Sequence, residues 1–435
     1  MSERISATAW PPPLQLADCA GDVPARADAV VVGAGLTGLS CAYHLLRQRP
    51  MASVVVLDAA AIGYGASGRT TGMVTPGIGQ DYAALVKRLG ARRAAAVYQE
   101  TRAAVHYVGE LVAAEAIDCE HERVALLMVA SGKAGAARLA RQAVALEATG
   151  QPCQRLDPFE LAERVRLRIG PANTRADALA ALRLPDAATL NPVKLLHGLA
   201  RAIQQRGGKL VGHARVLSMN AGATPSLRLA SGQTLAAATV VLATASESTS
   251  LANLTGRIIP IRLKIAATEP LAPECLLALG WKGRECIIDS RRLFNYFRLT
   301  RDRRIVFGGG APAYGSASRA ASFDDLLQEM RRTFPEGESL QIAKTWCGTI
   351  DYTLDGLPMI GPVRPDGDVF YVGGFCGHGI ALGIRSGKWV ADLIARKSSR
   401  RAFPGFRSKA PLIPGEWLRR SCFAAASGWM RLRGT

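Results

Sequence analysis

The chain has 435 residues, of which 49% are hydrophobic and 20% are charged, so it is long enough for two or three domains and too apolar for a disordered or fibrous protein. Its 54 Lys and Arg residues exceed its 35 Asp and Glu residues, which gives a formal net charge of +19. No zinc-finger spacing, basic-zipper heptad or RNA-binding aromatic signature accompanies this charge, so we expect no nucleic-acid partner.

The cysteine and histidine patterns indicate neither disulfides nor a metal. The nine cysteines are scattered without a C-x-x-C pair, and the start of the chain lacks the apolar core of a signal peptide. Both features predict reduced thiols in a cytoplasmic protein. The six histidines lie far apart without an H-E-x-x-H motif, so we expect no metal site. No apolar run approaches the roughly 18–20 residues that a membrane-spanning helix needs.

The first predicted elements are a strand, a glycine turn and a helix. The β-branched run Ala29–Val32 predicts a buried parallel strand, and residues 36–48 predict the helix. The turn between them fits the dinucleotide-binding pattern G-x-G-x-x-G with three glycines: Gly33, Gly35 and Gly38. The first allows the tight turn, the second admits a pyrophosphate, and the third lets the helix pack closely on the strand. Leu36 and Thr37 open the helix, whose N-terminal amides would face the pyrophosphate.

The following segment distinguishes between dinucleotides. A second predicted strand, 53–57, ends in Asp58, where a carboxylate can bind an adenosine ribose. Three alanines follow it, so no arginine stands ready for the 2′-phosphate of NADP. The stretch 63–79 is rich in glycine where a plain NAD fold would continue with a helix. Such a crossing loop lets the backbone pass close to a bulky planar group.

Residues Gly65–Arg69, GASGR, resemble the GASGRNGG pattern of the FAD-dependent oxidases of the D-amino-acid oxidase superfamily, although Thr70 and Thr71 depart from it. Further patches of resemblance lie at 191–210, 240–249, 295–310, 346–362 and 369–383. The resemblance spans roughly residues 10–395. It implies FAD as the cofactor and an α/β fold, in which a discontinuous Rossmann-like FAD-binding domain carries an α+β substrate domain built on an antiparallel sheet.

The resemblance and the glycine turn together predict these FAD-contacting residues: Gly33, Gly35, Leu36, Thr37, Gly38, Asp58, Ala66, Ser67, Gly68, Arg69, Val216, Ala243, Thr244, Gly348, Gly377, His378, Gly379 and Ile380. The glycine-rich junction 373–383 precedes a predicted helix that runs to about residue 395. Its N-terminus would stabilise the negative charge that builds at N1 and the C2 carbonyl of a reduced flavin. His378, in this turn, is either a neighbour of the flavin or substrate, or a residue that holds the loop.

The predicted FAD-binding domain comprises residues 26–80, 185–250 and 345–395, the substrate domain residues 81–184 and 251–344, and the basic C-terminal tail residues 396–435. Helical spacing is seen at 91–112 and 134–149, and alternation at 257–268, 284–289, 293–300 and 303–308. From Pro414 the tail predicts a helix with a rough apolar stripe. This tail would either dock onto the FAD-binding domain, which we favour, or make peripheral contact with an anionic membrane.

The resemblance implies that the flavin performs the redox chemistry: hydride moves from the carbon next to a neutral amine to flavin N5, and the imine product is hydrolysed. The candidate catalytic residues are Arg69, Tyr296, Arg298 and His378. Arg69 would hold a substrate carboxylate, line the flavin, or pair with a buried acid. Tyr296 and Arg298 lie two apart on one predicted strand, so they share a face that either lines the substrate pocket or is exposed.

Three positions depart from well-known members of the superfamily. Glycine and D-amino-acid oxidases carry a carboxylate-clamping arginine where this chain has Ile350, which disfavours a simple α-amino acid. Sarcosine oxidases attach flavin through a cysteine at the position of Gly348, one residue from Cys347, so we expect non-covalent FAD. Their oxygen-activating lysine corresponds to Val306, which leaves the electron acceptor open between oxygen and a quinone or other carrier.

The nearest pattern is that of γ-glutamylputrescine oxidoreductase-like bacterial amine oxidases, which share the GASGR loop and the W-x-G-x-x-x-x-T segment of residues 346–353. We therefore predict FAD-dependent oxidation of a small-molecule secondary or terminal amine, such as a γ-glutamylated polyamine. The alternatives are a D-amino-acid or glycine/sarcosine-type dehydrogenase, an NAD-dependent dehydrogenase, and a non-catalytic basic binding protein.

Overall fold

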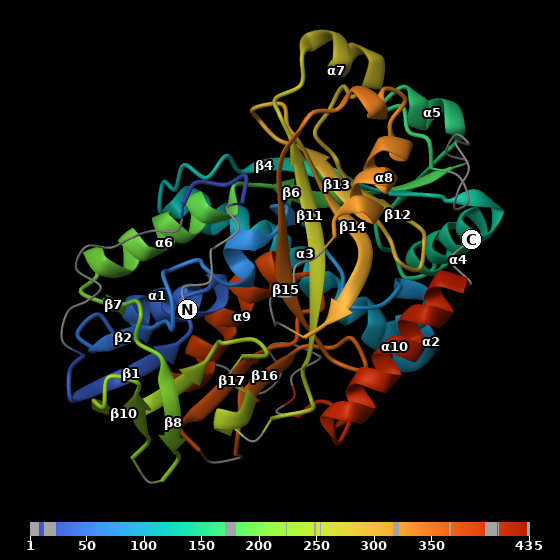
Figure 1. Ribbon diagram of the computed structural model, residues 1–435. Helices are drawn as coiled ribbons and strands as arrows, with labels where there is room; N and C mark the ends of the chain where they lie inside the picture. The colour runs from blue at the N-terminus through green and yellow to red at the C-terminus, as the bar shows by residue number, and fades with distance from the viewer. Residues whose placement is uncertain are drawn as a thin grey trace.

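The computed structural model describes residues 8–12, 23–169, 180–222, 224–247, 249–252, 254–315, 322–364, 367–395, 407 and 409–432. Two β-sheets organise this part of the chain (Figure 1). The eight-stranded sheet lies at the lower left of the figure, and the nine-stranded sheet rises above it.

The eight-stranded sheet has a parallel centre. Its strands are β1 (Arg26–Val32), β2 (Val54–Leu57), β7 (Lys209–Val211), β8 (Val216–Asn220), β9 (Ser226–Leu229), β10 (Thr234–Leu242), β16 (Met359–Pro362) and β17 (Val369–Gly373). The order is β16-β17-β10-β1-β2-β7, with β8 and β9 extending from β10, and the pairs from β17 to β7 are parallel. Alternate residues of β1 and β2 enter two separate cores, so both faces are covered. The helices on one face are α1 (Leu36–Gln48), α6 (Pro192–Gln205) and α9 (Gly379–Ile394).

The nine-stranded sheet is antiparallel except where β12 pairs with β4. Its strands are β3 (Met73–Val74), β4 (Glu122–Val129), β5 (Gln154–Leu156), β6 (Ala181–Thr189), β11 (Ile259–Thr268), β12 (Cys286–Asp289), β13 (Tyr296–Leu299), β14 (Ile305–Tyr314) and β15 (Ile342–Tyr352). One face packs on α5 (Pro158–Ala162), α7 (Pro273–Leu279) and α8 (Asp324–Thr333). The remaining helices are α2 (Tyr82–Leu89), α3 (Ala91–Ala114), α4 (Gly132–Glu147), α10 (Glu416–Leu432) and the short turns η1 (Ala66–Arg69), η2 (Thr249–Ala252) and η3 (Gly337–Ser339).

The predicted fold class is confirmed: a Rossmann-like parallel sheet is joined to a mainly antiparallel one. The predicted boundaries at 80, 185 and 345 do not follow the division between the sheets. β3 lies before residue 80, 185 falls within β6 and 345 within β15, yet all three strands pair in the nine-stranded sheet. Periodicity predicts that a segment is a strand, but it carries no information on which sheet the strand joins.

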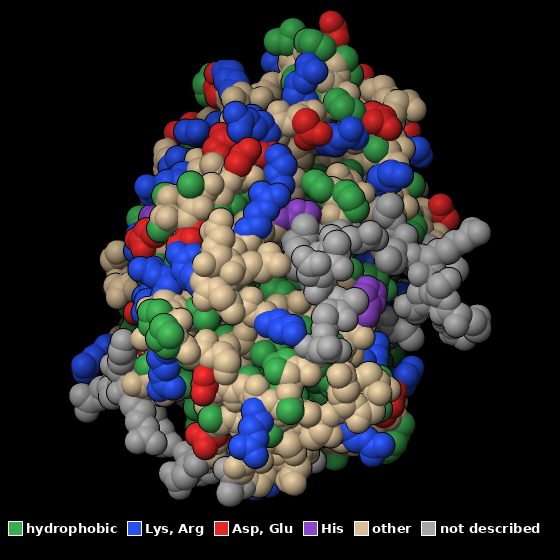
Figure 2. Space-filling model, turned by 90° about the vertical axis from the view of Figure 1, so that its left-hand side faces the viewer, with side chains coloured by type: hydrophobic (Ala, Val, Ile, Leu, Met, Phe, Trp, Pro, Cys, Tyr) green, Lys and Arg blue, Asp and Glu red, His purple; other side chains and the backbone are tan. Residues whose placement is uncertain are grey.

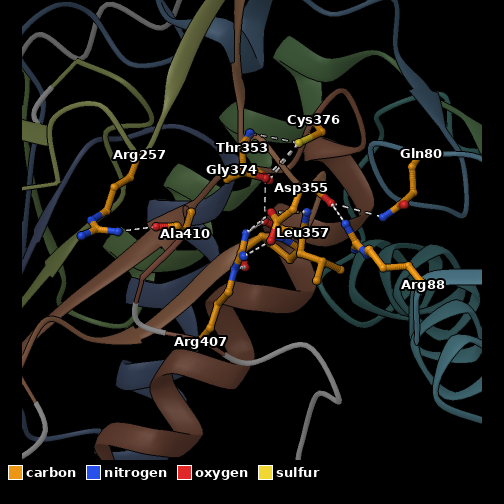
Figure 3. Close-up of polar contacts among 11 residues, drawn as sticks. Gln80, Arg88, Arg257, Thr353, Asp355, Leu357, Gly374, Cys376, Arg407 and Ala410 are labelled. Atoms are coloured by element: carbon orange, nitrogen blue, oxygen red, sulfur yellow. Dashed lines mark hydrogen bonds and ion pairs between the residues drawn. The ribbon is translucent and has the colours of Figure 1, made fainter. Parts of the chain in front are cut away.

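The described part of the tail contacts both sheets. The guanidinium of Arg407 forms two hydrogen bonds with the carboxylate of Asp355 (Figure 3). The backbone of Arg407 pairs with Ile360 of β16. Although burial opposes it, this arginine lowers the pKa of Asp355. The backbone carbonyl of the same Asp355 accepts hydrogen bonds from Arg88 (2.6 Å) and Gln80 (3.2 Å). The Asp355 turn therefore joins the tail to the crossing loop and to α2.

The helix α10 begins at Glu416, two residues after Pro414, and packs beside β14 of the nine-stranded sheet. The rings of Phe423 and Tyr314 lie 5.9 Å apart, and Arg419 donates to the Tyr314 hydroxyl at 3.2 Å. The tail thus docks, but onto the nine-stranded sheet as well as the expected one. Residues 396–406, 408 and 433–435 of the predicted tail lie outside the described residues.

The structure adds two observations on partners. On the face shown in Figure 2, Lys and Arg side chains lie in separate patches with Asp and Glu between them, without the continuous basic stripe typical of nucleic-acid-binding surfaces. Within the described ranges, no helix combines the length and the hydropathy required to cross a membrane.

Removal of residues 396–435 should lower the melting temperature by roughly 5 °C or more, because the Arg407–Asp355 pair and the packing of α10 are lost. Differential scanning fluorimetry measures this change. The matched control is Lys282→Gln, which breaks an exposed pair with Glu163 outside the tail and should leave the melting temperature unchanged. An unchanged melting temperature of the truncated protein, together with lost salt-sensitive sedimentation with anionic vesicles, would contradict docking.

Candidate active site

A cavity of about 710 Å³ lies where the two sheets meet. Its walls are the first turns of α1 and α9, the crossing loop, one face of β11 and β15, and part of α10. These six segments come from different regions of the chain. Both sheets and the tail therefore contribute residues to the walls of the cavity.

The glycine turn before α1 has the close contacts that its sequence predicts. Gly33 has a φ of +105°, and a Cβ atom there would lie 2.6 Å from the carbonyl oxygen of Ala243. A Cβ at Gly38 would lie 1.9 Å from the carbonyl oxygen of Gly33, so helix and strand pack without room for a side chain. A Cβ at Gly35 would lie 2.9 Å from Ser67 Oγ. α1 has no acidic residue in its first turn, so its positive dipole end is available to an anionic ligand.

Asp58 supports this turn from the end of β2. Its two carboxylate oxygens accept hydrogen bonds from the backbone N–H groups of Ala34 (2.8 Å) and Ala60 (2.9 Å). Burial raises the pKa of Asp58, while the two hydrogen bonds act in the opposite direction. The carboxylate holds the glycine turn in shape, and its contact with a ribose stays a prediction.

The crossing loop is tied down at three consecutive carbonyl groups, those of residues 69–71. They accept hydrogen bonds from the indole N–H of Trp346 (3.0 Å), the indole N–H of Trp10 (2.8 Å) and the guanidinium of Arg298. Arg298 also donates to the carbonyl of Leu190 at 2.7 Å. The prediction that Arg298 lines the substrate pocket is therefore wrong: its side chain is buried among backbone carbonyls. Burial lowers its pKa to about 10.

Arg69 lines the cavity, and among the described residues it does not pair with an acid. Its Nε donates to the carbonyl of Tyr64 at 3.0 Å, and its Nη1 donates to the carbonyl of Cys347 at 3.1 Å. The guanidinium also lies over the Tyr64 ring, 5.1 Å from its centroid. These contacts connect the crossing loop to β15. A contact of Arg69 with substrate stays a prediction.

The second helix N-terminus at the cavity, that of α9, follows a loop held by Asp351. The Asp351 carboxylate accepts a hydrogen bond from the N–H of Gly374, and its carbonyl accepts one from Cys376 at 3.0 Å. Burial raises the pKa of Asp351. Sequence reasoning did not single out this residue; the only signal is a carboxylate near the end of a strand just before the DGLP turn. α9 has no side-chain N-cap and no acidic residue in its first turn.

His378 stands directly before α9 and lines the cavity. Its Nδ1 lies 3.3 Å from Thr75 Oγ1, which ties the α9 turn to the crossing loop. Burial lowers the pKa of His378, so its imidazole is neutral near pH 7. The two interpretations of this histidine are therefore compatible, because it holds the loop and also faces the cavity.

The wall contributed by the nine-stranded sheet is apolar. Alternate residues of β11 line it: Ile259, Ile261, Leu263 and Ile265. Ile350 of β15 stands opposite Ile261 and extends the same wall.

Gly348 lines the cavity, whereas Cys347 is in register with Lys264, whose ammonium group pairs with Asp325. Tyr296 also lines the cavity, and burial raises its pKa.

Two-thirds of the predicted FAD-contacting residues line the cavity, namely Gly35, Leu36, Thr37, Ala66, Ser67, Arg69, Ala243, Gly348, Gly377, His378, Gly379 and Ile380. The remaining six lie outside its lining: Gly33, Gly38, Asp58, Gly68, Val216 and Thr244. Among the described residues, the buried hydroxyl of Thr244 has no hydrogen-bond partner. A buried unpaired hydroxyl beside the glycine turn is a further sign that a polar ligand belongs there.

Comparison with known proteins agrees with this geometry. The family model described as FAD dependent oxidoreductase (DAO) matches residues 28–393. The gamma-glutamylputrescine oxidoreductase of Escherichia coli (strain K12) is 29% identical over 93% of this chain and 92% of its own length. Glycine oxidase from Geobacillus kaustophilus superposes with a TM-score of 0.70 at 22% identity, covering 87% of this chain and 96% of that one. L-proline dehydrogenase from P. horikoshii superposes with a TM-score of 0.68 at 19% identity, covering 93% and 99%. These structural likenesses establish the fold.

Substitution of Gly35 by valine should reduce bound flavin to roughly a tenth or less of the wild-type content, because a branched side chain would displace Ser67 and fill the space at the start of α1. The ratio of visible flavin absorbance to protein absorbance after desalting measures the effect. Gly428→Ala serves as the control, since a Cβ there meets no atom within 4 Å. A fully loaded, yellow Gly35→Val protein would contradict the assignment of this turn.

Proposed function

The chain belongs to the DAO family of FAD-dependent oxidoreductases, and we propose that within this family it oxidises a secondary or terminal amine. It is an FAD-dependent amine or amino-acid oxidoreductase. The observation that supports the narrower substrate class is the apolar wall of β11 and β15, which includes Ile350. The resemblance assigns to this position the carboxylate-clamping arginine of glycine and D-amino-acid oxidases.

The cavity residues fit FAD. The first turn of α1, with Ser67 beside it, would hold the pyrophosphate. The Thr244 hydroxyl, which has no hydrogen-bond partner among the described residues, lies next to the glycine turn. The crossing loop and the first turn of α9 would border the flavin ring. When bound, FAD supplies the two-electron acceptor for the carbon–nitrogen bond. The N-terminus of α9 would stabilise negative charge developing near it, because no acidic side chain competes for its amides.

The protein's own contribution to the reaction is to position a neutral amine. Burial against Ile261, Leu263 and Ile350 disfavours the protonated form and lowers the pKa of a bound amine. His378 adds no positive charge near pH 7 because burial lowers its pKa. Tyr296 lines the same cavity and would orient the substrate. The apolar wall also excludes water from the reacting carbon.

The position of Gly348 supports non-covalent binding of FAD. Gly348 lines the cavity and has no side chain to form a bond, whereas the neighbouring Cys347 is not among the lining residues. Burial also raises the pKa of the Cys347 thiol, which lowers its nucleophilicity near pH 7.

The name of the Escherichia coli relative supports a γ-glutamylated polyamine as the first substrate to test. A glycine- or sarcosine-type substrate is the second candidate, because glycine oxidases are also among the relatives. The family match to FAD-dependent oxidoreductases disfavours both the NAD-dependent dehydrogenase and the non-catalytic binding protein. Position 306, which the resemblance assigns to the oxygen-activating lysine of sarcosine oxidases, holds a buried valine in this chain. Both oxygen and a quinone therefore remain candidate acceptors.

Acid precipitation of the purified enzyme should release all of its flavin into the supernatant, because Gly348 offers no side chain for a covalent bond. The supernatant and the washed pellet are compared by flavin fluorescence. Flavin that stays on the denatured polypeptide would show that a neighbouring residue such as Cys347 is attached and would contradict non-covalent binding.

Anaerobic mixing with a γ-glutamylated diamine or another terminal amine should bleach the flavin about tenfold faster or more than glycine or D-alanine, since Ile350 provides no clamp for an α-carboxylate. Stopped-flow absorbance measures the rates, and re-oxidation by oxygen or by a soluble quinone then identifies the acceptor. Faster bleaching by α-amino acids than by every amine tested would contradict the proposal.

A further inference from the structure

The helix α10 forms one wall of the candidate active site. The tail residues that line the cavity are Ile413, Arg419, Cys422, Phe423, Ala426 and Ser427. The position of α10 is fixed at one end by Arg419 and Phe423 against Tyr314, and farther along by Trp429 against Arg292. A substrate in this cavity therefore lies against the last helix of the chain.

The arginines that line the cavity differ in how far their donors are used. Five arginines line the cavity: Arg69, Arg138, Arg291, Arg292 and Arg419. Four of these arginines are bonded to oxygen atoms of the protein. Arg69 donates to two carbonyl groups, and Arg138 pairs with Asp81. Arg291 pairs with Asp289 and Glu329, and Arg419 donates to the Ile413 carbonyl and the Tyr314 hydroxyl. These four are occupied in holding the walls of the cavity together.

Arg292 is the exception. Its guanidinium carbon lies 4.4 Å from the centroid of the Trp429 ring, and the residue is exposed. Within the described part of the chain Arg292 forms neither a hydrogen bond nor an ion pair. Stacking uses the flat face of a guanidinium and leaves the N–H groups at its edge free. Arg292 is thus a positioned cation with unused donors at the cavity.

Ser427 supplies a second unused polar group. It is only 6% exposed, it lines the same cavity, and its Oγ has no hydrogen-bond partner among the residues that the structure describes. Burying a hydroxyl group without a hydrogen-bond partner is unfavourable, because the group loses its hydrogen bonds to water. A ligand atom that accepts its hydrogen bond would remove this penalty.

We propose that Arg292 and Ser427 form a distal subsite that binds a carboxylate at the end of the amine substrate remote from the oxidised carbon. A carboxylate suits this pair because it can accept charge-assisted hydrogen bonds from the edge of a guanidinium and a further one from a hydroxyl. The apolar residues of β11 would hold the methylene chain between the two polar ends. The subsite rests on the proposed function, since it defines the amine as one that also carries a distal acid.

A binding experiment tests the subsite without turnover. Isothermal titration of the FAD-loaded enzyme with pentanoate and with pentanamide should show binding of the acid only. Arg292→Gln should weaken pentanoate binding about tenfold or more, and Ser427→Ala should weaken it by a smaller factor that Ser427→Thr restores. The controls are Arg420→Gln and Ser421→Ala, two changes on the same helix at residues outside the cavity lining. Absence of pentanoate binding, or equal binding by wild type and Arg292→Gln, overturns the proposal.

Steady-state kinetics separates this proposal from the function on which it rests. With 5-aminopentanoate, Arg292→Gln should raise KM about tenfold and leave kcat nearly unchanged, while KM for 5-aminopentanamide stays the same. If amines reduce the flavin but the acid and the amide have equal KM values, the subsite is wrong and the amine-oxidising function stands. If pentanoate binds through Arg292 but no amine reduces the flavin, the proposed function fails while the anion-binding site stands.

Discussion

The architecture of the active site depends on three hydrogen bonds to consecutive carbonyl groups of the crossing loop. Buried carbonyls must find donors, and here Trp346, Trp10 and Arg298 provide them from three distant parts of the chain. These donors fix the loop between the eight-stranded sheet, which carries the glycine turn, and the nine-stranded sheet, which carries the apolar wall. The loop, held in this way, lines the cavity where the two sheets meet.

The electrostatics of the cavity follow from how its acidic groups are used. Asp58 and Asp351 lie near the two helix N-termini, but each carboxylate is engaged by backbone N–H groups of the loop that it supports. The first turns of α1 and α9 contain no acidic residue. Both helix ends therefore offer positive potential to the cavity, which suits a ligand with a pyrophosphate and an electron-accepting ring. The opposite wall stays apolar, which suits a neutral amine.

Sequence predicted the parts of the fold that depend on local chemistry. The glycine turn, α1 and the alternation of β11 follow from steric limits and periodicity, and the structure has them where expected. Arg298 was misassigned because it shares a strand face with Tyr296, which lines the cavity. The sequence does not reveal that the Arg298 side chain meets the crossing loop instead. Arg292 went unnoticed, since nothing in the sequence distinguishes it from its neighbour Arg291, which is bonded to two carboxylates, whereas Arg292 has no such partner among the residues that the structure describes.

Composition and periodicity were insufficient to predict what the C-terminal tail contacts. A basic segment with an apolar stripe suits a membrane surface or a docking site equally well, and only tertiary contacts distinguish the two. The structure directs Phe423 and Ser427 toward the cavity and leaves Trp417 72% exposed. Because α10 completes a cavity assembled from distant segments, folding of the tail and binding at the cavity are thermodynamically linked. A ligand that contacts α10 must stabilise the docked tail. A change that releases the tail must weaken the binding of that ligand by the same free energy.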